Sequence, residues 1–287
     1  MRPLHAISVD VEDWYQSTID VGAELSSRFE DSTHKVLEAF AAANTIGTFF
    51  ILGLVARKAP HLVKAIASAG HEVQSHGYGH RFVHDLGEEP FRQDLLSAKG
   101  ILEDTCGQEI YGYRAPCFTI DLRNPWALDV LAETGHRYDS SIFPVAMSRY
   151  GIDGYPPHPR RITTPRGHSL VEAPVACFDL FHRRRPIGGG GYFRLWSYFM
   201  IRGAWRQLER LGRPGIVYMH PYEYDPREMD AYAHCVPLRQ RLHQGLGRRG
   251  FPKKIDRLLR EFAFGPMRAV LADLLETPCA KRHPDGT

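Results

Sequence analysis

Short strand-like runs alternate with helix-like runs through the first two-thirds of this chain, and this alternation constrains the fold more than any other feature. The strand-like runs are residues 7–11, 48–52, 72–75 and 111–114, with a later one at 216–219. The helix-like runs, in which apolar residues recur on one helix face, are residues 32–44, 54–69, 90–105 and 125–134. Because such alternation builds parallel βαβ units, the expected fold class is α/β, as a barrel or an open sheet.

The composition is that of an ordinary soluble enzyme. Hydrophobic residues make up 43% and charged residues 24% of the 287 positions, which is enough to bury a substantial core. With 36 Lys and Arg against 33 Asp and Glu, the net charge of +3 does not indicate a nucleic-acid or membrane partner. No apolar run approaches the roughly 20 residues that span a bilayer.

Two features bear on the cellular compartment. The N-terminal stretch reaches acidic residues by position 10 and lacks the apolar region of a secretory signal. The five cysteines are scattered and include no CxxC pair, which favours reduced thiols. We therefore expect a cytoplasmic protein, and the sequence leaves its oligomeric state open.

The chain becomes less regular after about residue 183. Gly188 to Gly191 form a glycine run without the lysine of a phosphate-binding loop, which predicts a hinge or a substrate loop. Residues 238–275 are basic and helical in pattern. We expect a barrel domain over residues 1–235 and a helical extension over residues 236–287 that packs on it.

Polar residues cluster where the predicted strands end. These residues are Asp10, His76, Arg114, Asp139 and His220. In α/β barrels the C-terminal ends of the strands meet at one face, and this face carries the active site. The cluster is the first indication of a catalytic function.

A pair of histidines suggests a metal ion. His76 and His80 lie four residues apart in the segment SHGYGH, a spacing at which two imidazoles can reach one metal; two ordinary loop histidines are the alternative. The segment DVED at residues 10–13 supports the metal interpretation, because three carboxylates at the end of a buried strand need a cation or an arginine nearby. Two histidines and one carboxylate form the ligand set of a catalytic metal site with open positions.

Two further strand ends offer partners for proton transfer. Arg114, in the segment YRAP, can pair with Asp10 and tune it as a general base, and a surface arginine is the alternative. His220, in the segment YMHP, can act as a general acid, and a structural histidine is the alternative.

The order of these motifs resembles that of the polysaccharide deacetylase family, also called the NodB-homology or carbohydrate esterase 4 group. An acidic strand end is followed by SHGYGH, YRAP, YDSS and YMHP, and the match covers roughly residues 4–225. Within the group, the chain resembles the subfamily of peptidoglycan deacetylases and allantoinase-like proteins. Residues 189–195 and 258–271 resemble the deacetylases of bacterial exopolysaccharide gene clusters.

The resemblance implies a distorted (β/α) barrel of about seven strands and a divalent metal ion, most often zinc. It makes His76 and His80 metal ligands, with a carboxylate of the first motif as the third. The family's first motif has two adjacent aspartates, a base and then a ligand, and DVED departs from it. Either Asp10 is the base and Glu12 the ligand, or Glu12 is the base and Asp13 the ligand. We expect Asp10 as the base, since the strand period of two places Asp10 and Glu12 on one face, and leave the third ligand open between Glu12 and Asp13.

By the same resemblance, Arg114 orients the base, His220 protonates the leaving amine, and Asp139 holds His220 or contacts the substrate. The expected reaction is removal of an N-acetyl group from an amino sugar, a glycan or a glycan precursor by metal-activated water. A cytoplasmic precursor or a nucleotide-linked sugar is the expected substrate, and no site for nucleic acid is visible. The alternatives are hydrolysis of another amide, a formamide or an O-acetyl ester, and a catalytically inactive glycan-binding module.

Overall fold

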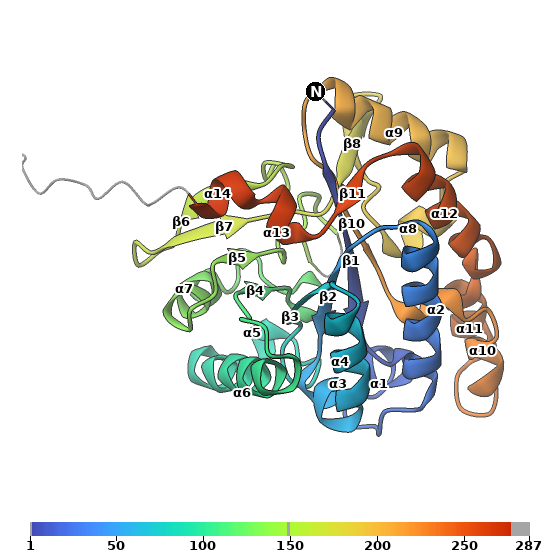
Figure 1. Cartoon of the computed structure of the whole chain (residues 1–287), viewed down its shortest axis with the longest axis horizontal. Helices are drawn as coiled ribbons and strands as arrows, with labels where there is room; N and C mark the ends of the chain where they lie inside the picture. The colour runs from blue at the N-terminus through green and yellow to red at the C-terminus, as the bar shows by residue number, and fades with distance from the viewer. Residues whose placement is uncertain (1, 148–149, 277–287) are drawn as a thin grey trace, which may run out of the picture.

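Parallel strands joined by helices form the centre of the structure, as the alternating sequence pattern predicts. The computed structural model describes residues 2–147 and 150–276 (Figure 1). The strands are β1 (His5–Val11), β2 (Thr48–Ile51), β3 (Glu72–Ser75), β4 (Gly112–Tyr113), β5 (Tyr138–Asp139), β6 (Arg160–Thr163), β7 (Ser169–Glu172), β8 (Cys177–Leu180), β9 (Arg183–Pro186), β10 (Ile216–Met219) and β11 (Phe264–Gly265). The α-helices are α1 (Trp14–Thr18), α2 (Arg28–Ala42), α3 (Gly53–Lys58), α4 (Pro60–Ser68), α5 (Val83–Leu86), α6 (Glu88–Cys106), α7 (Trp126–Glu133), α8 (Gly190–Leu195), α9 (Tyr198–Arg210), α10 (Glu228–Ala231), α11 (Leu238–Gly245), α12 (Phe251–Glu261), α13 (Met267–Val270) and α14 (Ala272–Glu276).

The main sheet has the strand order β10-β1-β2-β3-β4-β5-β7-β6, and β11 pairs beside the start of β1. Within the described residues, seven strands of this order run parallel, from β10 to β7, and β6 is antiparallel to β7. The expected α/β fold, a distorted barrel of about seven strands, is therefore confirmed. The carboxyl ends of the parallel strands lie at one end of the sheet, where the site residues follow them.

The sheet is curled, and the segments that follow β7 and β9 hydrogen-bond to its edge strand β10. The Ala176 N–H donates to the Ile216 carbonyl at 2.9 Å, and the Tyr218 N–H donates to the Gly188 carbonyl at 2.7 Å. Gly189 forms an isolated parallel bridge with Tyr218, and its φ of +155° is one that side chains rarely adopt. The glycine run that the sequence predicted as a hinge or substrate loop is instead buried against β10 at Gly188 to Gly190.

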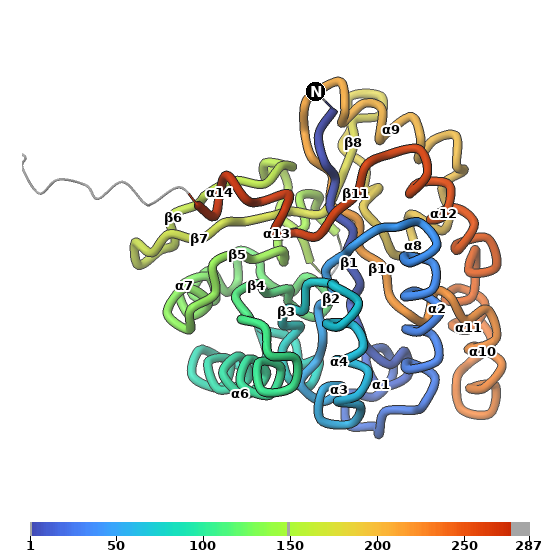
Figure 2. The backbone as a smooth tube through the Cα atoms, viewed as in Figure 1, coloured from blue at the N-terminus to red at the C-terminus, as the bar shows by residue number. Residues whose placement is uncertain are grey.

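The core lies between the sheet and the helices outside it. All of β1 is buried, as expected for a parallel strand covered on both faces. Phe40 of α2, Trp205 of α9 and Ile255 of α12 belong to the same buried cluster as the sheet residues Val9 and Phe49. Figure 2 shows the backbone of α12 and β11 returning to the N-terminal strand β1.

The C-terminal part of the chain is helical, as expected, and its described portion packs on the sheet. Residues 277–287 of the predicted extension lie outside the described residues, and the boundary at residue 235 stays a prediction. The single helix predicted at residues 54–69 is divided into α3 and α4, because Pro60 starts a new helix after Ala59 leaves the helical conformation. None of the described helices combines the length and apolar character needed to cross a bilayer.

Replacing Gly189 should be far more harmful than replacing a glycine on a helix surface. A Cβ at Gly189 would lie 1.9 Å from the Tyr218 carbonyl oxygen, whereas one at Gly203 of α9 meets nothing within 4 Å. We expect Gly189→Ala to lower the free energy of unfolding by about 3 kcal/mol or more, and Gly203→Ala to leave it unchanged or raise it by about 0.5–1 kcal/mol. Urea denaturation of both variants checks this. Equal effects would contradict the close contact of Gly189 with Tyr218 of β10.

Two buried histidines should make stability depend on pH. Burial lowers the pKa of both His5 and His71 to about 4, and each Nδ1 accepts a backbone N–H, from Gly215 at 2.9 Å and from Gly47 at 3.1 Å. Because the folded-state pKa is depressed, each contributes stability that is present above pH 6.5 and is lost as the pH falls toward 4.

We expect the free energy of unfolding to decline over that range by up to about 1.4 kcal/mol per pH unit for each histidine. His71→Asn keeps an acceptor for Gly47 but does not titrate, so its pH profile should be shallower than that of the wild type. Denaturation curves at several pH values measure both slopes. Identical slopes would show that His71 is not held neutral by burial.

Candidate active site

The ends of neighbouring parallel strands bring five predicted site residues together. Asp10 lies in β1 and Glu12 follows it, His76 follows β3, Arg114 follows β4, and His220 follows β10. All five side chains are buried or nearly so. The clustering inferred from the strand ends is therefore present in the folded chain.

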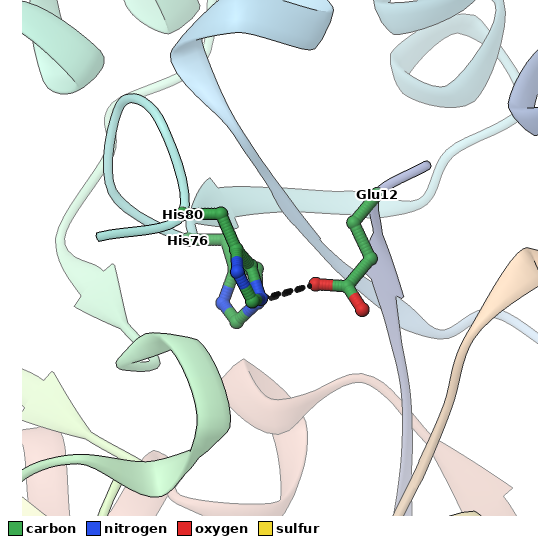
Figure 3. A group of neighbouring side chains, drawn as sticks. All are labelled: Glu12, His76 and His80. Atoms are coloured by element: carbon green, nitrogen blue, oxygen red, sulfur yellow. Dashed lines mark ion pairs between the residues drawn. The ribbon is translucent and has the colours of Figure 1, made fainter. Parts of the chain in front are cut away.

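Glu12, His76 and His80 form a group whose ligand atoms all lie within 4.8 Å of one another (Figure 3). Glu12 Oε2 is 2.7 Å from His80 Nε2 and 3.4 Å from His76 Nε2. Figure 3 shows both imidazoles pointing toward the Glu12 carboxylate. No other polar group of the described residues donates a hydrogen bond to Glu12 Oε2.

The chemistry of this donor set fits a divalent cation. His76 Nδ1 lies 2.8 Å from the Arg114 carbonyl oxygen, which can only accept, so Nδ1 carries a proton and Nε2 is the atom that faces Glu12. A buried carboxylate is unfavourable without a positive charge beside it. Two imidazoles and a carboxylate suit zinc and several other transition metals.

The two histidines are placed by a tight turn after β3 and not by a helix. Gly77 and His80 have φ of +76° and +62°. A Cβ at Gly77 would lie 2.9 Å from Asp94 Oδ2, and that oxygen accepts the Tyr78 N–H at 2.8 Å. The glycine of SHGYGH thus allows a carboxylate of α6 to hold the turn between the two histidines.

Asp13 lies next to Glu12 in sequence but has a different environment. Its Oδ1 accepts the N–H groups of Tyr15 and Gln16 at 3.0 and 3.2 Å, which makes Asp13 the N-cap of α1. Its Oδ2 accepts both the N–H and the hydroxyl of Ser26. The structure therefore brings Glu12, and not Asp13, beside the two histidines.

Arg114 and Asp10 form a buried ion pair within the curled sheet. The Arg114 side chain is 0% exposed, and its Nη1 donates to Asp10 Oδ1 at 2.7 Å. The same guanidinium donates to Ser8 Oγ at 2.8 Å and to Ser140 Oγ at 3.0 Å. Asp10 is thus held in one orientation at the wall of the cavity described below.

His220 lies near Oε1 of Glu12, whereas His76 and His80 lie near Oε2. Its Nε2 is 3.6 Å from Glu12 Oε1, and its Nδ1 is 3.6 Å from Glu223 Oε2. The ring of Tyr222 stacks on the imidazole with centroids 4.6 Å apart. Burial would lower the pKa of His220, but the neighbouring charges of Glu12, Glu223 and Asp10 raise it overall.

Glu223 is a site residue that the sequence analysis missed. It is buried, its Oε2 accepts the His220 backbone N–H at 3.1 Å, and its Oε1 lies 3.3 Å from Arg194 Nε. The signal was present in the segment HPYE, since a glutamate three residues after the start of a helical turn often folds back on that start.

Asp139 is not among the residues that gather around Glu12. The sequence analysis placed it against His220 or the substrate, whereas the structure places it at the end of β5, in register with Glu172 of β7. Its Oδ1 accepts the Ser141 hydroxyl, and Ser141 Oγ accepts the Ala115 N–H at 2.7 Å. Burial raises the pKa of Asp139 to about 6.

A cavity of about 270 Å³ lies over these groups. Asp10, Glu12, His76, His80 and His220 contribute its polar lining. Aromatic side chains form much of the remainder, and they are Phe82, Phe118, Tyr150, Tyr218 and Tyr222. One wall of the cavity thus carries the group that could hold a metal ion, and the other walls are aromatic. Such a cavity is a typical binding site for a small polar molecule with apolar faces.

The curled parallel sheet thus carries a two-histidine carboxylate group that could hold a metal ion, beside a buried Asp–Arg pair. Residues 12–138 match the family model described as polysaccharide deacetylase. Residues 140–272 match a second model, described as a domain of unknown function, DUF3473. Residues 12–138 therefore match the family that the motifs resembled, and the DUF3473 match follows them.

Among the curated relatives of the chain are two bacterial deacetylases. A peptidoglycan-N-acetylglucosamine deacetylase of Bacillus cereus is 33% identical over 90 residues, which are 30% of this chain and 33% of that protein. A chitooligosaccharide deacetylase of Sinorhizobium fredii is 28% identical over 126 residues, 42% of this chain and 56% of that protein. The matches thus span between a third and somewhat over half of these relatives.

The similarity to a solved structure covers the whole fold. A crystal structure from Mycobacterium smegmatis, of a protein assigned to the polysaccharide deacetylases, superposes with a TM-score of 0.63 at 20% sequence identity. The superposition covers 99% of this chain and 95% of the other. At this identity the comparison establishes the shared fold.

Paired variants of Glu12 and Asp13 distinguish a metal ligand from a helix cap. We expect Glu12→Gln to weaken zinc affinity by about 100-fold or more, because it removes a charged ligand atom. Asp13→Asn should keep the zinc affinity while lowering the free energy of unfolding by about 1 kcal/mol, because an amide nitrogen in place of Oδ2 cannot accept the N–H and hydroxyl of Ser26. Competition titration with a chelating dye and thermal denaturation measure the two effects. Loss of zinc in Asp13→Asn with retention in Glu12→Gln would reverse the assignment.

Proposed function

We propose that the protein is a metal-dependent hydrolase that removes an N-acetyl group from an acetylated carbohydrate. The observation that carries the proposal is the meeting of three groups in one cavity: the Glu12–His76–His80 cluster, the Asp10–Arg114 pair and His220. The family match over residues 12–138 supports it, as do the two relatives, whose names state deacetylation of N-acetylated glycans.

In this proposal Glu12, His76 and His80 hold the divalent ion, and zinc is the best candidate for two nitrogen ligands and one oxygen ligand. Such an ion supplies a Lewis acid for the acetyl carbonyl and lowers the pKa of bound water. Asp13 keeps a structural role at the N-terminus of α1, where both of its oxygens already accept hydrogen bonds.

Asp10 is the proposed general base. Arg114 occupies its Oδ1, so the remaining oxygen is the one that can take a proton from water in the cavity. The guanidinium of Arg114 is itself held by hydrogen bonds to Ser8 and Ser140. It therefore keeps the Asp10 carboxylate in one orientation. A fixed carboxylate beside the ligand group has the geometry that general-base catalysis requires.

His220 is the proposed general acid for the leaving amine. Its Nε2 faces Glu12 and the cavity, and its Nδ1 faces the buried Glu223. A carboxylate next to Nδ1 fixes the ring and favours the charged form, which can release a proton from Nε2. We assign this orienting role to Glu223. For Asp139 we propose a supporting role through Ser141, which holds the Ala115 N–H next to Arg114.

Acetate release from acetylated amino sugars tests the proposal. We expect the zinc-loaded wild type to release acetate, and a chelator to abolish this release. Asp10→Asn should lower kcat by about 10²–10⁴-fold while still binding zinc, because it removes the base and not a ligand. His76→Ala should lose both zinc and activity.

The control is His61→Ala, which changes an exposed histidine that pairs with Glu30 on the surface. It should bind zinc and release acetate as the wild type does. A metal-loaded wild type that releases no acetate from N-acetylglucosamine, its oligomers or peptidoglycan fragments would contradict the proposed reaction, as would full activity of Asp10→Asn.

A further inference from the structure

The DUF3473 region contributes a polar side chain to the cavity, far along the chain from the metal-competent group. Gln244, near the C-terminal end of α11, lines the same cavity as Asp10 and Glu12. Helix α11 itself contains no buried residue, so packing of an apolar face does not explain why this end of the helix lies at the cavity. A specific set of contacts holds it there.

Two buried arginines fix the backbone at Gln244. Arg194 Nη1 and Arg248 Nε both donate to the Gln244 carbonyl oxygen, at 2.6 and 2.9 Å. Arg194 and Arg248 are 8% and 0% exposed. Each also contacts the segment that carries His220, since Arg194 lies 3.3 Å from Glu223 and Arg248 donates to the Tyr222 carbonyl at 2.8 Å. The position of Gln244 is therefore tied directly to that of the proposed acid.

The carbonyl oxygen of Gln244 accepts two hydrogen bonds, but its side-chain amide makes none with any group of the described residues. An amide offers both a donor and an acceptor, as does the hydroxyl or acetamido group of a sugar. The cavity lining includes the carboxylates of Asp10 and Glu12 and, among the described residues, no lysine or arginine. This electrostatic environment favours an uncharged ligand over a phosphorylated one.

The size of the cavity limits what can occupy it. Its volume of about 270 Å³ lies at the lower end of the range for small-molecule sites. One sugar ring with its acetamido group suits such a space better than several linked units. The space next to the Glu12–His76–His80 group thus suits a single neutral acetamido-sugar ring.

We propose that Gln244 is a specificity-determining residue whose amide hydrogen-bonds a polar substituent of that single acetamido-sugar ring. This inference rests on the proposed deacetylase function and adds the substrate contact made by the DUF3473 region. A site built to hydrogen-bond a substrate group discriminates strongly against loss of that bond. Gln244 therefore acts in binding, whereas Asp10 and His220 act on the proton transfers.

The test compares Gln244→Met with Gln240→Met. Methionine keeps the length of the side chain and removes the amide, and Gln240 lies one turn earlier on α11 without lining the cavity. The substrates are N-acetylglucosamine and tetra-N-acetylchitotetraose, with acetate release measured on the zinc-loaded full chain. We expect Gln244→Met to raise KM about 10-fold, the effect of one lost hydrogen bond, with kcat within twofold of the wild type. Gln240→Met should match the wild type in both constants.

The outcomes separate this inference from the proposed function. An active wild type with an unchanged KM in Gln244→Met overturns the role of Gln244 and leaves the deacetylase function standing. A larger effect on kcat than on KM also overturns it, because it would place Gln244 in the chemical step. If the wild type is inactive on both sugars and on peptidoglycan fragments, the proposed function fails, and calorimetric titration of the same two sugars decides the inference separately. Equal affinity in wild type and Gln244→Met, or no binding to the wild type, overturns it.

Discussion

The buried guanidinium of Arg114 is the interaction on which the rest of the site depends. A fully desolvated cation is stable only if its hydrogen bonds are satisfied, and here Asp10, Ser8 and Ser140 satisfy them while the Phe50 ring lies 4.2 Å from the charge. Removing one partner of such a pair costs about 3–5 kcal/mol because the other charge remains buried. The Arg114 carbonyl also fixes the tautomer of His76. One residue thus orients both the proposed base and a proposed metal ligand.

The two family matches divide the chain near residue 139, but the sheet and the site do not follow that division. Strands β7 and β10 come from the second region; β7 pairs with β5 at the end of the first region, and β10 pairs with β1 just before it. The first region supplies Glu12, His76, His80 and Arg114, and the second supplies His220, Glu223 and Gln244. A chain ending near residue 139 would lack the proposed acid and one wall of the cavity. The DUF3473 region is in this sense part of the folded unit that forms the proposed site.

Sequence reasoning predicted the parts that depend on local pattern. Strands β1, β2 and β10 follow from apolar runs, and the meeting of His76 with the acidic motif follows from the rule that parallel strand ends share one face. It did not predict the hairpin β8–β9, whose second strand, RRRP, has no strand-like pattern. The choice between Glu12 and Asp13 depends on the residue at which β1 ends and α1 begins, which periodicity cannot locate. Glu223 and Gln244 were missed because their roles arise from contacts with Arg194 and Arg248, many residues away.

Anomalous diffraction from zinc-soaked crystals tests the central claim most directly, because it locates the metal without reference to activity. The account predicts one peak at about 2.0–2.2 Å from Glu12 Oε2, His76 Nε2 and His80 Nε2, with Asp10 outside the coordination sphere and still bound to Arg114. A peak coordinated by Asp13, or fully loaded crystals without a peak between the two histidines, would contradict it.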